Sequence, residues 1–283
     1  MPEAFRPRLV ADALREAALG RIDLSGLWVA FKKDRIVASL LTQPLAGKAV
    51  GVWAPEVVPV WRRRFVAASL VREALADVAG RGYRIAQALV DRTSPRSAAG
   101  DLARGGMPRI THLIYLTRST TPPLAVPPSV PRFLWSEYGP GTDEEFRAIL
   151  SATYHGSLDM PELEGVRSLD DVIAGHRAAG RFDPSRWKVG VVEDDPSSGA
   201  IVLLADQPER GSWEVAYLGL TPAARGRGLG RMALAHALEM ARPHAKRLEL
   251  AVDARNKPAS KLYKRAGFLP FERRAVHLKV LKA

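Results

Sequence analysis

The stretch Arg225-Gly226-Arg227-Gly228-Leu229-Gly230 decides how this chain is interpreted. It separates an apolar segment with the character of a strand, 214–220, from a segment with helical apolar spacing, 229–241. Glycines let backbone N–H groups converge on an anion without a Cβ atom in the way, and a helix N-terminus carries positive dipole charge. The stretch therefore predicts a phosphate cradle, with positive charge added by Arg225, Arg227 and Arg231.

Two familiar phosphate loops do not match this stretch. It lacks both the dinucleotide pattern G-x-G-x-x-G and the Walker pattern that ends in Gly-Lys-Ser/Thr. The pattern that fits is R-x-x-G-x-G, with Arg225, Gly228 and Gly230 at the fixed positions. A tight turn without a ligand is the structural alternative for so short a pattern.

The residues downstream extend the pattern over 187–280. A second apolar strand leads to an Asn and a short helix, and a Gly-Phe pair follows the helix. With these features the chain resembles the GNAT-type acyl-CoA N-acyltransferases, in which such residues recur in the same order; here they are Asn256, Ala259, Leu262, Tyr263, Gly267 and Phe268.

The resemblance implies acetyl-CoA as cosubstrate. In the family, the backbone of the strand before the loop pairs with the pantetheine amides, and the loop amides hold the pyrophosphate. The cofactor-binding residues expected here are Leu218, Gly219, Leu220, Arg225, Gly226, Arg227, Gly228, Leu229, Gly230, Arg231, Asn256 and Ala259. The chain has no cysteine and its six histidines lack metal-ligand spacing, so no metal is expected.

Two side chains are candidates for proton transfer. Glu214 lies eleven residues before Arg225, the spacing of the basic glutamate in the histone-acetylating branch of the family. Tyr263 occupies the family's general-acid position, and a phenol near pKa 10 protonates a thiolate only slightly uphill. The structural alternatives are a surface glutamate at a strand start and a tyrosine that only packs against its helix.

The acceptor is expected at the first two helices of the family fold and their connection, here 153–163. An amine could be bound there by polar side chains, although two of the carboxylates equally suit helix capping or the surface. The candidates are Tyr154, Ser157, Asp159 and Glu162.

The chain is expected to hold two domains of mixed α/β class, each a splayed mixed sheet flanked by helices. Five prolines among residues 120–131 predict a semi-rigid linker without helix or central strand. The expected domains are 1–119, a degenerate GNAT-like copy, and 132–283, the catalytic copy. In the second, we expect helices at 142–154, 169–179, 229–241 and 258–265, strands at 187–193, 200–205, 213–220 and 247–253, and turns at 194–199 and 208–211.

The first copy lacks what the chemistry needs. Its strand-to-helix segment, 56–64, contains no glycine, and Pro59 has no N–H to donate. Bulky side chains such as Trp61 obstruct the backbone there. The position that corresponds to Tyr263 falls near Asp101 or Leu102.

Charge is concentrated in the first copy. Residues 1–119 hold 19 Lys and Arg against 10 Asp and Glu, within a net charge of +12 for the chain. No nucleic-acid signature accompanies this charge, so nucleic acid is not the expected partner.

No segment has the length of a membrane span or the apolar core of a signal peptide, which predicts a cytoplasmic protein. The alternative to an N-acetyltransferase acting on a primary amine is a non-catalytic acyl-CoA-binding module whose basic half docks an anionic partner.

Overall fold

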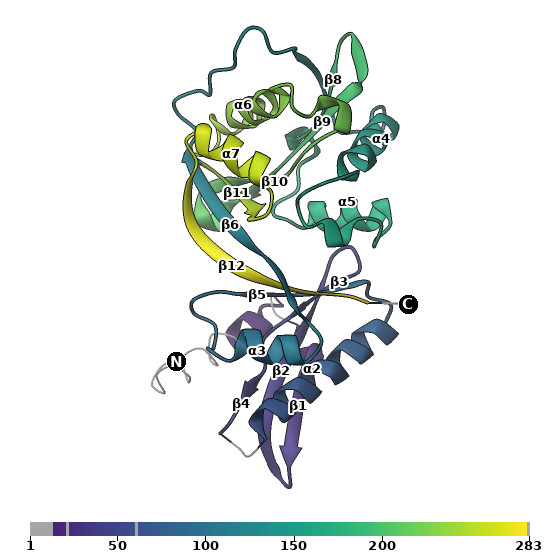
Figure 1. Cartoon of the computed structure of the whole chain (residues 1–283), viewed down its shortest axis with the longest axis vertical. Helices are drawn as coiled ribbons and strands as arrows, with labels where there is room; N and C mark the ends of the chain where they lie inside the picture. The colour runs from purple at the N-terminus through teal and green to yellow at the C-terminus, as the bar shows by residue number, and fades with distance from the viewer. Residues whose placement is uncertain (1–13, 21–22, 60–61, 282–283) are drawn as a thin grey trace. The chain divides into compact units, whose positions relative to one another are not determined.

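The computed structural model of the chain describes residues 14–20, 23–59 and 62–281. It forms two compact units, shown in Figure 1. The N-terminal unit comprises residues up to Thr111 together with the segment from Arg274 onward, and the C-terminal unit comprises His112–Arg273. Both are mixed α/β, which confirms the predicted fold class at this level.

The N-terminal unit is built on a sheet with the strand order β1-β2-β3-β5-β12, and β4 pairs with β2 beside this path. Only β3 and β5 are parallel neighbours. Its elements are β1 (Leu27–Lys32), β2 (Arg35–Leu45), β3 (Ala49–Val52), β4 (Glu56–Val57), α2 (Arg63–Gly80), β5 (Ile85–Val90) and α3 (Ala98–Arg104), with the short 3₁₀ helix η2 (Leu24–Gly26).

The C-terminal unit is built on a sheet with the order β6-β11-β10-β9-β8-β7, in which only β10 and β11 are parallel. Its strands are β6 (Arg109–Ser119), β7 (Phe133–Glu137), β8 (Trp187–Val192), β9 (Asp195–Gln207), β10 (Ser212–Leu220), β11 (Arg247–Asp253) and the start of β12 (Leu269–Val280). Its helices are α4 (Asp143–Tyr154), α5 (Leu169–Arg177), α6 (Leu229–Ala241) and α7 (Lys257–Arg265), with 3₁₀ helices η3 (Pro161–Leu163), η4 (Pro184–Arg186), η5 (Pro208–Arg210) and η6 (Pro222–Ala224).

The two sheets share one topology, but each is completed by the last strand of the other half of the sequence. The path β1-β2-β3-β5-β12 in one unit matches β8-β9-β10-β11-β6 in the other, with the same parallel and antiparallel pairs. The repeat of elements read from the sequence is therefore present. The compact units cut the chain at residues 111 and 273, and the predicted boundary at 120–131 stays a prediction.

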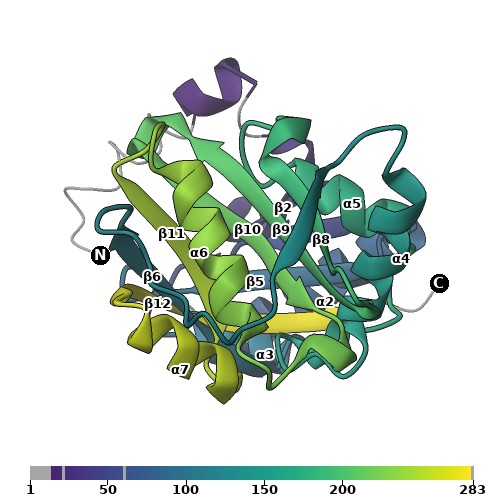
Figure 2. The same cartoon turned by 90° about the horizontal axis from the view of Figure 1, so that it is seen from above.

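Helices cover both faces of the C-terminal sheet. Figure 2 shows α6 lying across β9, β10 and β11. Leu229, Leu234 and Leu238 of α6 belong to the core on that face, whereas Phe146 and Leu150 of α4 belong to the core on the other. Because both faces of β9 are covered, it is a nearly continuous run of buried residues rather than an alternating one.

Two predicted elements have the expected bounds, most of the others differ by one or two residues, and the strand predicted at 200–205 differs by more. The strand 247–253 and the helix 229–241 agree at both ends, and residues 121–131 contain neither helix nor strand. The strand predicted to begin at Ala200 begins at Asp195, so the prediction of 194–199 as a turn alone was wrong. Val191 pairs with Gly199 and Val192 with Asp195. The bulged residues between them keep the turn chemistry, because both Ser197 Oγ and Ser198 Oγ donate to the Asp195 carboxylate.

No helix in the described part of the chain is long and apolar enough to cross a membrane. Among the same residues, no group of three or more His, Cys, Asp or Glu side chains is arranged to hold a metal ion.

Candidate functional site

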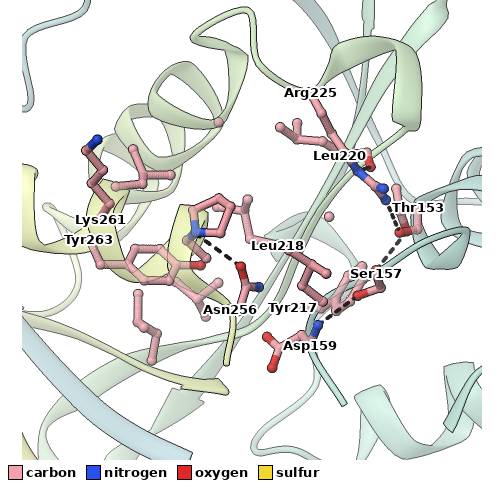
Figure 3. Close-up of a pocket in the computed structure, with 18 of the residues that line it drawn as sticks. Thr153, Ser157, Asp159, Tyr217, Leu218, Leu220, Arg225, Asn256, Lys261 and Tyr263 are labelled. Carbon is pink, nitrogen blue, oxygen red and sulfur yellow. Dashed lines mark hydrogen bonds between the residues drawn. The ribbon is translucent and has the colours of Figure 1, made fainter. Parts of the chain in front are cut away.

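A pocket of about 850 Å³ opens in the C-terminal unit where β10 and β11 part. The two strands pair only from Trp213 to Val215, and a bulge at Ala216 follows in β10. Beyond the bulge, β10 is paired with β9 alone among the described strands. The pocket volume is in the range of small-molecule sites. Figure 3 shows its principal side chains, which come from β10, from the connection after α4, and from α7.

The predicted phosphate loop forms one side of this pocket. Gly226 and Gly228 have φ angles of 75° and 81°, a region that L side chains rarely adopt, so glycine is required there. Arg225 N and Arg231 N donate to the carbonyls of Pro222 and Gly228. The five amides between them, those of 226–230, have no hydrogen-bond acceptor within the described residues. They lie at the positive end of α6, where an anion would satisfy them.

The loop arginines are engaged with the protein itself. The Arg225 guanidinium donates to the carbonyls of Leu220, Gly156 and Thr153, at 3.2, 3.1 and 2.9 Å. Arg227 pairs with Asp195 at 2.6 Å, and Arg231 Nε donates to Ala125 O at 2.7 Å. Arg225 therefore ties the loop to the C-terminal end of α4. The sequence suggested that these charges point at a phosphate, whereas each of the three guanidinium groups contacts the protein itself.

Tyr263 enters the pocket from α7 (Figure 3). Its residue surface is 7% exposed, and its ring packs against Phe268 with centroids 5.9 Å apart. The phenolic oxygen has no protein partner among the described residues. Burial raises the pKa of Tyr263 above its ordinary value, and the carboxylate of Asp159 raises it further. The phenol is therefore held in the protonated form, and it is a weaker acid than the sequence argument assumed.

Asn256 and Ala259 position the helix that carries Tyr263. Asn256 Oδ1 accepts from Ala259 N at 3.2 Å and so caps the N-terminus of α7. Both residues line the pocket, so the cap is part of its wall. The predicted position of Gly267 just beyond the helix is confirmed by its φ of 85°.

Glu214 lies on β10 but does not line the pocket. Its carboxylate accepts from Gln207 Nε2 at 2.9 Å and from Arg210 NH2 at 2.8 Å. Burial raises its pKa, and the Arg210 guanidinium opposes that rise. Its role as the base stays a prediction.

The four predicted acceptor residues separate into two pairs. Ser157 and Asp159 line the pocket. Tyr154 lies behind it, with its hydroxyl 2.9 Å from His176 Nε2 and its ring stacked on Tyr217. Glu162 is held by Arg255 at 2.6 Å.

The structure thus collects most of the predicted residues in one pocket. Leu218, Gly219, Leu220, Arg225, Gly226, Gly228, Gly230, Arg231, Asn256, Ala259, Tyr263, Ser157 and Asp159 line it. The side chains of Arg227, Tyr154, Glu162 and Glu214 are engaged elsewhere, and Leu229 is fully buried in the core. Their roles remain predictions.

Sequence reasoning missed several lining residues. Tyr217 lies under the loop, with its hydroxyl 2.8 Å from Thr153 Oγ1 and its ring beside Gly219. A Cβ at Gly219 would lie 2.6 Å from that ring. Lys261 and Arg265 also line the pocket from α7. Their spacing of four residues, which places both on one helix face, was the available signal.

Comparison with known proteins identifies the family of this chain. The sequence model of the acetyltransferase (GNAT) family matches residues 139–268. A mycothiol acetyltransferase of Beutenbergia cavernae is 33% identical over 232 residues, covering 72% of this chain and 74% of that protein. A mycothiol acetyltransferase of Nocardia farcinica is 32% identical over 224 residues, covering 76% of this chain and 69% of that protein.

Solved structures show the same fold. A GCN5-related N-acetyltransferase from Sphaerobacter thermophilus superposes with a TM-score of 0.55 at 19% identity, covering 89% of this chain and 79% of that one. The sequence relatives extend over most of both chains, and the matched segment contains the glycine loop and Tyr263. The chain therefore belongs to the GNAT family of acetyltransferases.

Proposed function

We propose that this chain transfers an acetyl group from acetyl-CoA to a primary amine by direct attack of the amine on the thioester. One observation carries the proposal. Five consecutive backbone amides without protein partners in the described chain lie at the N-terminus of α6, and three of their residues, Gly226, Gly228 and Gly230, line the pocket that Tyr263 also lines. An anion site and a proton donor in one pocket suit a phosphate-bearing thioester.

The residues of the pocket have separate tasks in this proposal. When bound, acetyl-CoA supplies the thioester carbonyl and a thiolate leaving group. The amides of 226–230 hold its pyrophosphate, and β10 beyond the bulge offers backbone groups to the pantetheine arm. A backbone N–H near Leu218 or Gly219 stabilises the oxyanion. Tyr263 gives its phenolic proton to the departing sulfur.

The raised pKa of Tyr263 suits this task in one respect and limits it in another. The phenol carries its proton throughout the working pH range, so no turnover is lost to a deprotonated acid. Proton transfer to a thiolate, whose thiol has a pKa near 8.5, is more uphill than from an ordinary phenol. Transfer therefore costs least when the negative charge on sulfur is largest, which times the proton to the breaking C–S bond.

We also propose that the two halves of the sequence arose by duplication, with 1–119 and 132–283 as the original copies and 120–131 as the linker. The shared strand order supports this proposal. In this view the first copy has lost the cofactor site and serves as scaffold.

The test is release of free thiol from acetyl-CoA in the presence of a panel of primary amines. The panel includes the amine precursor of mycothiol, because the curated relatives are mycothiol acetyltransferases. Thiol release that depends on one amine, with the acetylated product found by mass spectrometry, supports the enzyme. Tight acetyl-CoA binding by calorimetry without release for any amine would favour the non-catalytic binding module instead.

A further inference from the structure

Three carboxylates lie around the connection that follows α4, and two of them are neutralised by one guanidinium. Arg255 donates to Glu162 at 2.6 and 2.9 Å. It also donates to Asp253 Oδ2 at 2.7 Å, and the Asp253 side chain is fully buried. Glu162 and Asp253 therefore share the Arg255 guanidinium, whereas no ion pair to Asp159 is found among the described residues. The cationic side chains that line the pocket are Arg225, Arg231, Lys261 and Arg265.

Asp159 is the third carboxylate, and it faces the pocket. It is the only Asp or Glu among the described residues that line it. Asp159 Oδ1 accepts from Asp253 N at 3.0 Å, and Asp159 N donates to Ser157 Oγ at 3.2 Å. Oδ2 makes no hydrogen bond with any residue of the described chain. In Figure 3 the carboxylate turns towards the side on which Tyr263 enters the pocket. The side chain is therefore fixed through one oxygen and available through the other.

The groups that face Asp159 set its basicity. Burial raises its pKa to about 6; the charge of Asp253 adds to this rise, while the hydrogen bond from Asp253 N and the Arg255 guanidinium oppose it. The negative charge of Asp159 also raises the pKa of two phenols, those of Tyr217 on β10 and Tyr263 on α7. A carboxylate of this kind is ionised at neutral pH and is a stronger base than an exposed aspartate.

Glu214 shares with Asp159 a pKa raised by burial, but it differs in position and in its partners. It does not line the pocket, and its charge is offset by Arg210 at 2.8 Å. Gln207 takes up further acceptor capacity of the same carboxylate. Of the two carboxylates, Asp159 is thus the one with an open oxygen toward the space where an acceptor must lie.

We propose that Asp159 receives the acceptor as an ammonium ion in this pocket and accepts its proton, so that the substrates are primary amines that bind in the cationic form. This inference rests on the proposed function. The Asp159 carboxylate, which has no ion-pair partner among the described residues, attracts the cationic amine of the acceptor. The electrostatic attraction between the carboxylate and an ammonium ion is stronger in a partly enclosed pocket than in water, because the local dielectric constant is lower.

The proton balance follows from this assignment. The ammonium gives one proton to Asp159 Oδ2, and the freed electron pair of nitrogen forms the C–N bond with the thioester carbon. The C–S bond breaks with its electron pair on sulfur, which takes the phenolic proton of Tyr263. The proton that the new amide nitrogen loses restores the phenol. Asp159 returns its own proton to solvent, so one proton is released for each amide formed.

The first experiment compares two matched variants, Asp159→Asn and Glu214→Gln, with wild type over a range of pH. For the best amine of the panel, wild-type kcat/KM should fall as the pH drops through about 6, because Asp159 must be ionised to accept the proton. Asp159→Asn should remove this limb and lower kcat/KM by about 10²–10⁴-fold. Glu214→Gln should keep the limb and lose less than about tenfold.

Calorimetry with acetyl-CoA separates a catalytic effect from damage to the fold, because the amide oxygen introduced by Asp159→Asn can still accept the hydrogen bond from Asp253 N. Cofactor affinity should be unchanged in Asp159→Asn. The inference is overturned if that variant keeps the acidic limb or more than a tenth of the activity, or if Glu214→Gln abolishes the limb.

A second measurement does not need turnover. In protein saturated with coenzyme A, the carboxyl carbon of Asp159 is titrated by ¹³C NMR, with Asp159→Asn to assign the signal. Methylammonium should lower the pKa of Asp159, because a bound cation favours the ionised form. An Asp159 pKa that does not respond to methylammonium overturns the inference. If no amine in the panel reacts but methylammonium shifts this pKa, the proposed function fails and the ammonium site stands.

Discussion

The two units make the same strand-to-helix connection in opposite ways. In the C-terminal unit, β10 leads through η6 into a glycine loop, and five amides without partners in the described chain lie where α6 begins. In the N-terminal unit, β3 leads into β4, which pairs with β2, and the connection contains no glycine. Residues 60–61 of that connection, including the predicted obstruction Trp61, lie outside the described part of the chain.

The helices that follow differ as well. At the start of α2, the Arg63 guanidinium donates to both oxygens of Asp101 on α3, at 3.2 and 2.9 Å, and to Ser97 Oγ at 2.6 Å. The corresponding helices in the C-terminal unit, α6 and α7, border the pocket instead, with Gly230 and Tyr263 in its wall. An ion pair thus joins α2 to α3 in the N-terminal unit, whereas α6 and α7 border a cavity in the C-terminal unit. The comparison teaches that this topology leaves a cavity with free backbone amides only where the connection contains glycines and no ion pair joins the two helices.

The largest expected effect comes from Gly228→Val, which makes the second connection resemble the first. Gly228 has a φ of 81°, and a Cβ there would lie 3.1 Å from Val130. Losing two hydrogen bonds to a charged phosphate costs roughly 1.5–3 kcal/mol each. We expect acetyl-CoA affinity to fall by about 10³-fold or more, measured by calorimetry. Gly82→Val is the matched control, since Gly82 has a φ of 82° in open space; equal loss in both variants would contradict the loop assignment.

Tyr263→Phe should give the next largest effect. It makes the second copy resemble the first, which has no tyrosine near Asp101 in the corresponding helix. We expect kcat to fall on the order of 10²–10³-fold, from the loss of a general acid. Acetyl-CoA affinity should stay within about twofold of wild type, because the phosphate donors are backbone amides. Stopped-flow thiol release measures the first quantity and calorimetry the second. Tyr83→Phe, in the N-terminal unit, is the control; an undiminished kcat in Tyr263→Phe would make the tyrosine a packing residue.

Arg63→Ala tests the ion pair of the N-terminal unit. The Asp101 side chain is fully buried, and the variant leaves it only Arg104, at 3.3 Å. Removing one partner of a buried pair costs roughly 3–5 kcal/mol, and we expect the lower value because Arg104 remains. The measurement is the denaturant midpoint of the N-terminal unit, with the exposed Arg64→Ala as control. Acetyl-CoA binding should not change. Stability equal to that of Arg64→Ala would show that the ion pair does not hold α2 to α3.

The smallest effect is a factor of two in stoichiometry. If only the second connection binds the cofactor, acetyl-CoA should titrate to one equivalent per chain. Calorimetry on wild type gives this number directly, and Gly228→Val should reduce it to none. Two equivalents, or one that survives in Gly228→Val, would mean that the N-terminal unit binds cofactor without a glycine loop.

Local patterns in the sequence predicted the elements that carry the site. The position of Tyr263 in the pocket was expected from the family resemblance. The glycine loop and the bounds of α6 and β11 instead follow from residues close together in the chain. Each depends on backbone conformation or on apolar period, and both are set by neighbouring residues.

Tertiary structure alone decided the rest. No local pattern states that β6 and β12 complete each other's sheets, because an edge strand accepts any partner of suitable register. The contact partners of long side chains could not be predicted from the sequence either. Arg225 is bound to the end of α4, and Glu214 is paired with Arg210. The basicity of Asp159 depends on Asp253, 94 residues away. The sequence therefore determined the glycine loop and the helix that follows it, while the partners of each charge, and hence which carboxylate has an oxygen open to the pocket, came from contacts between distant segments.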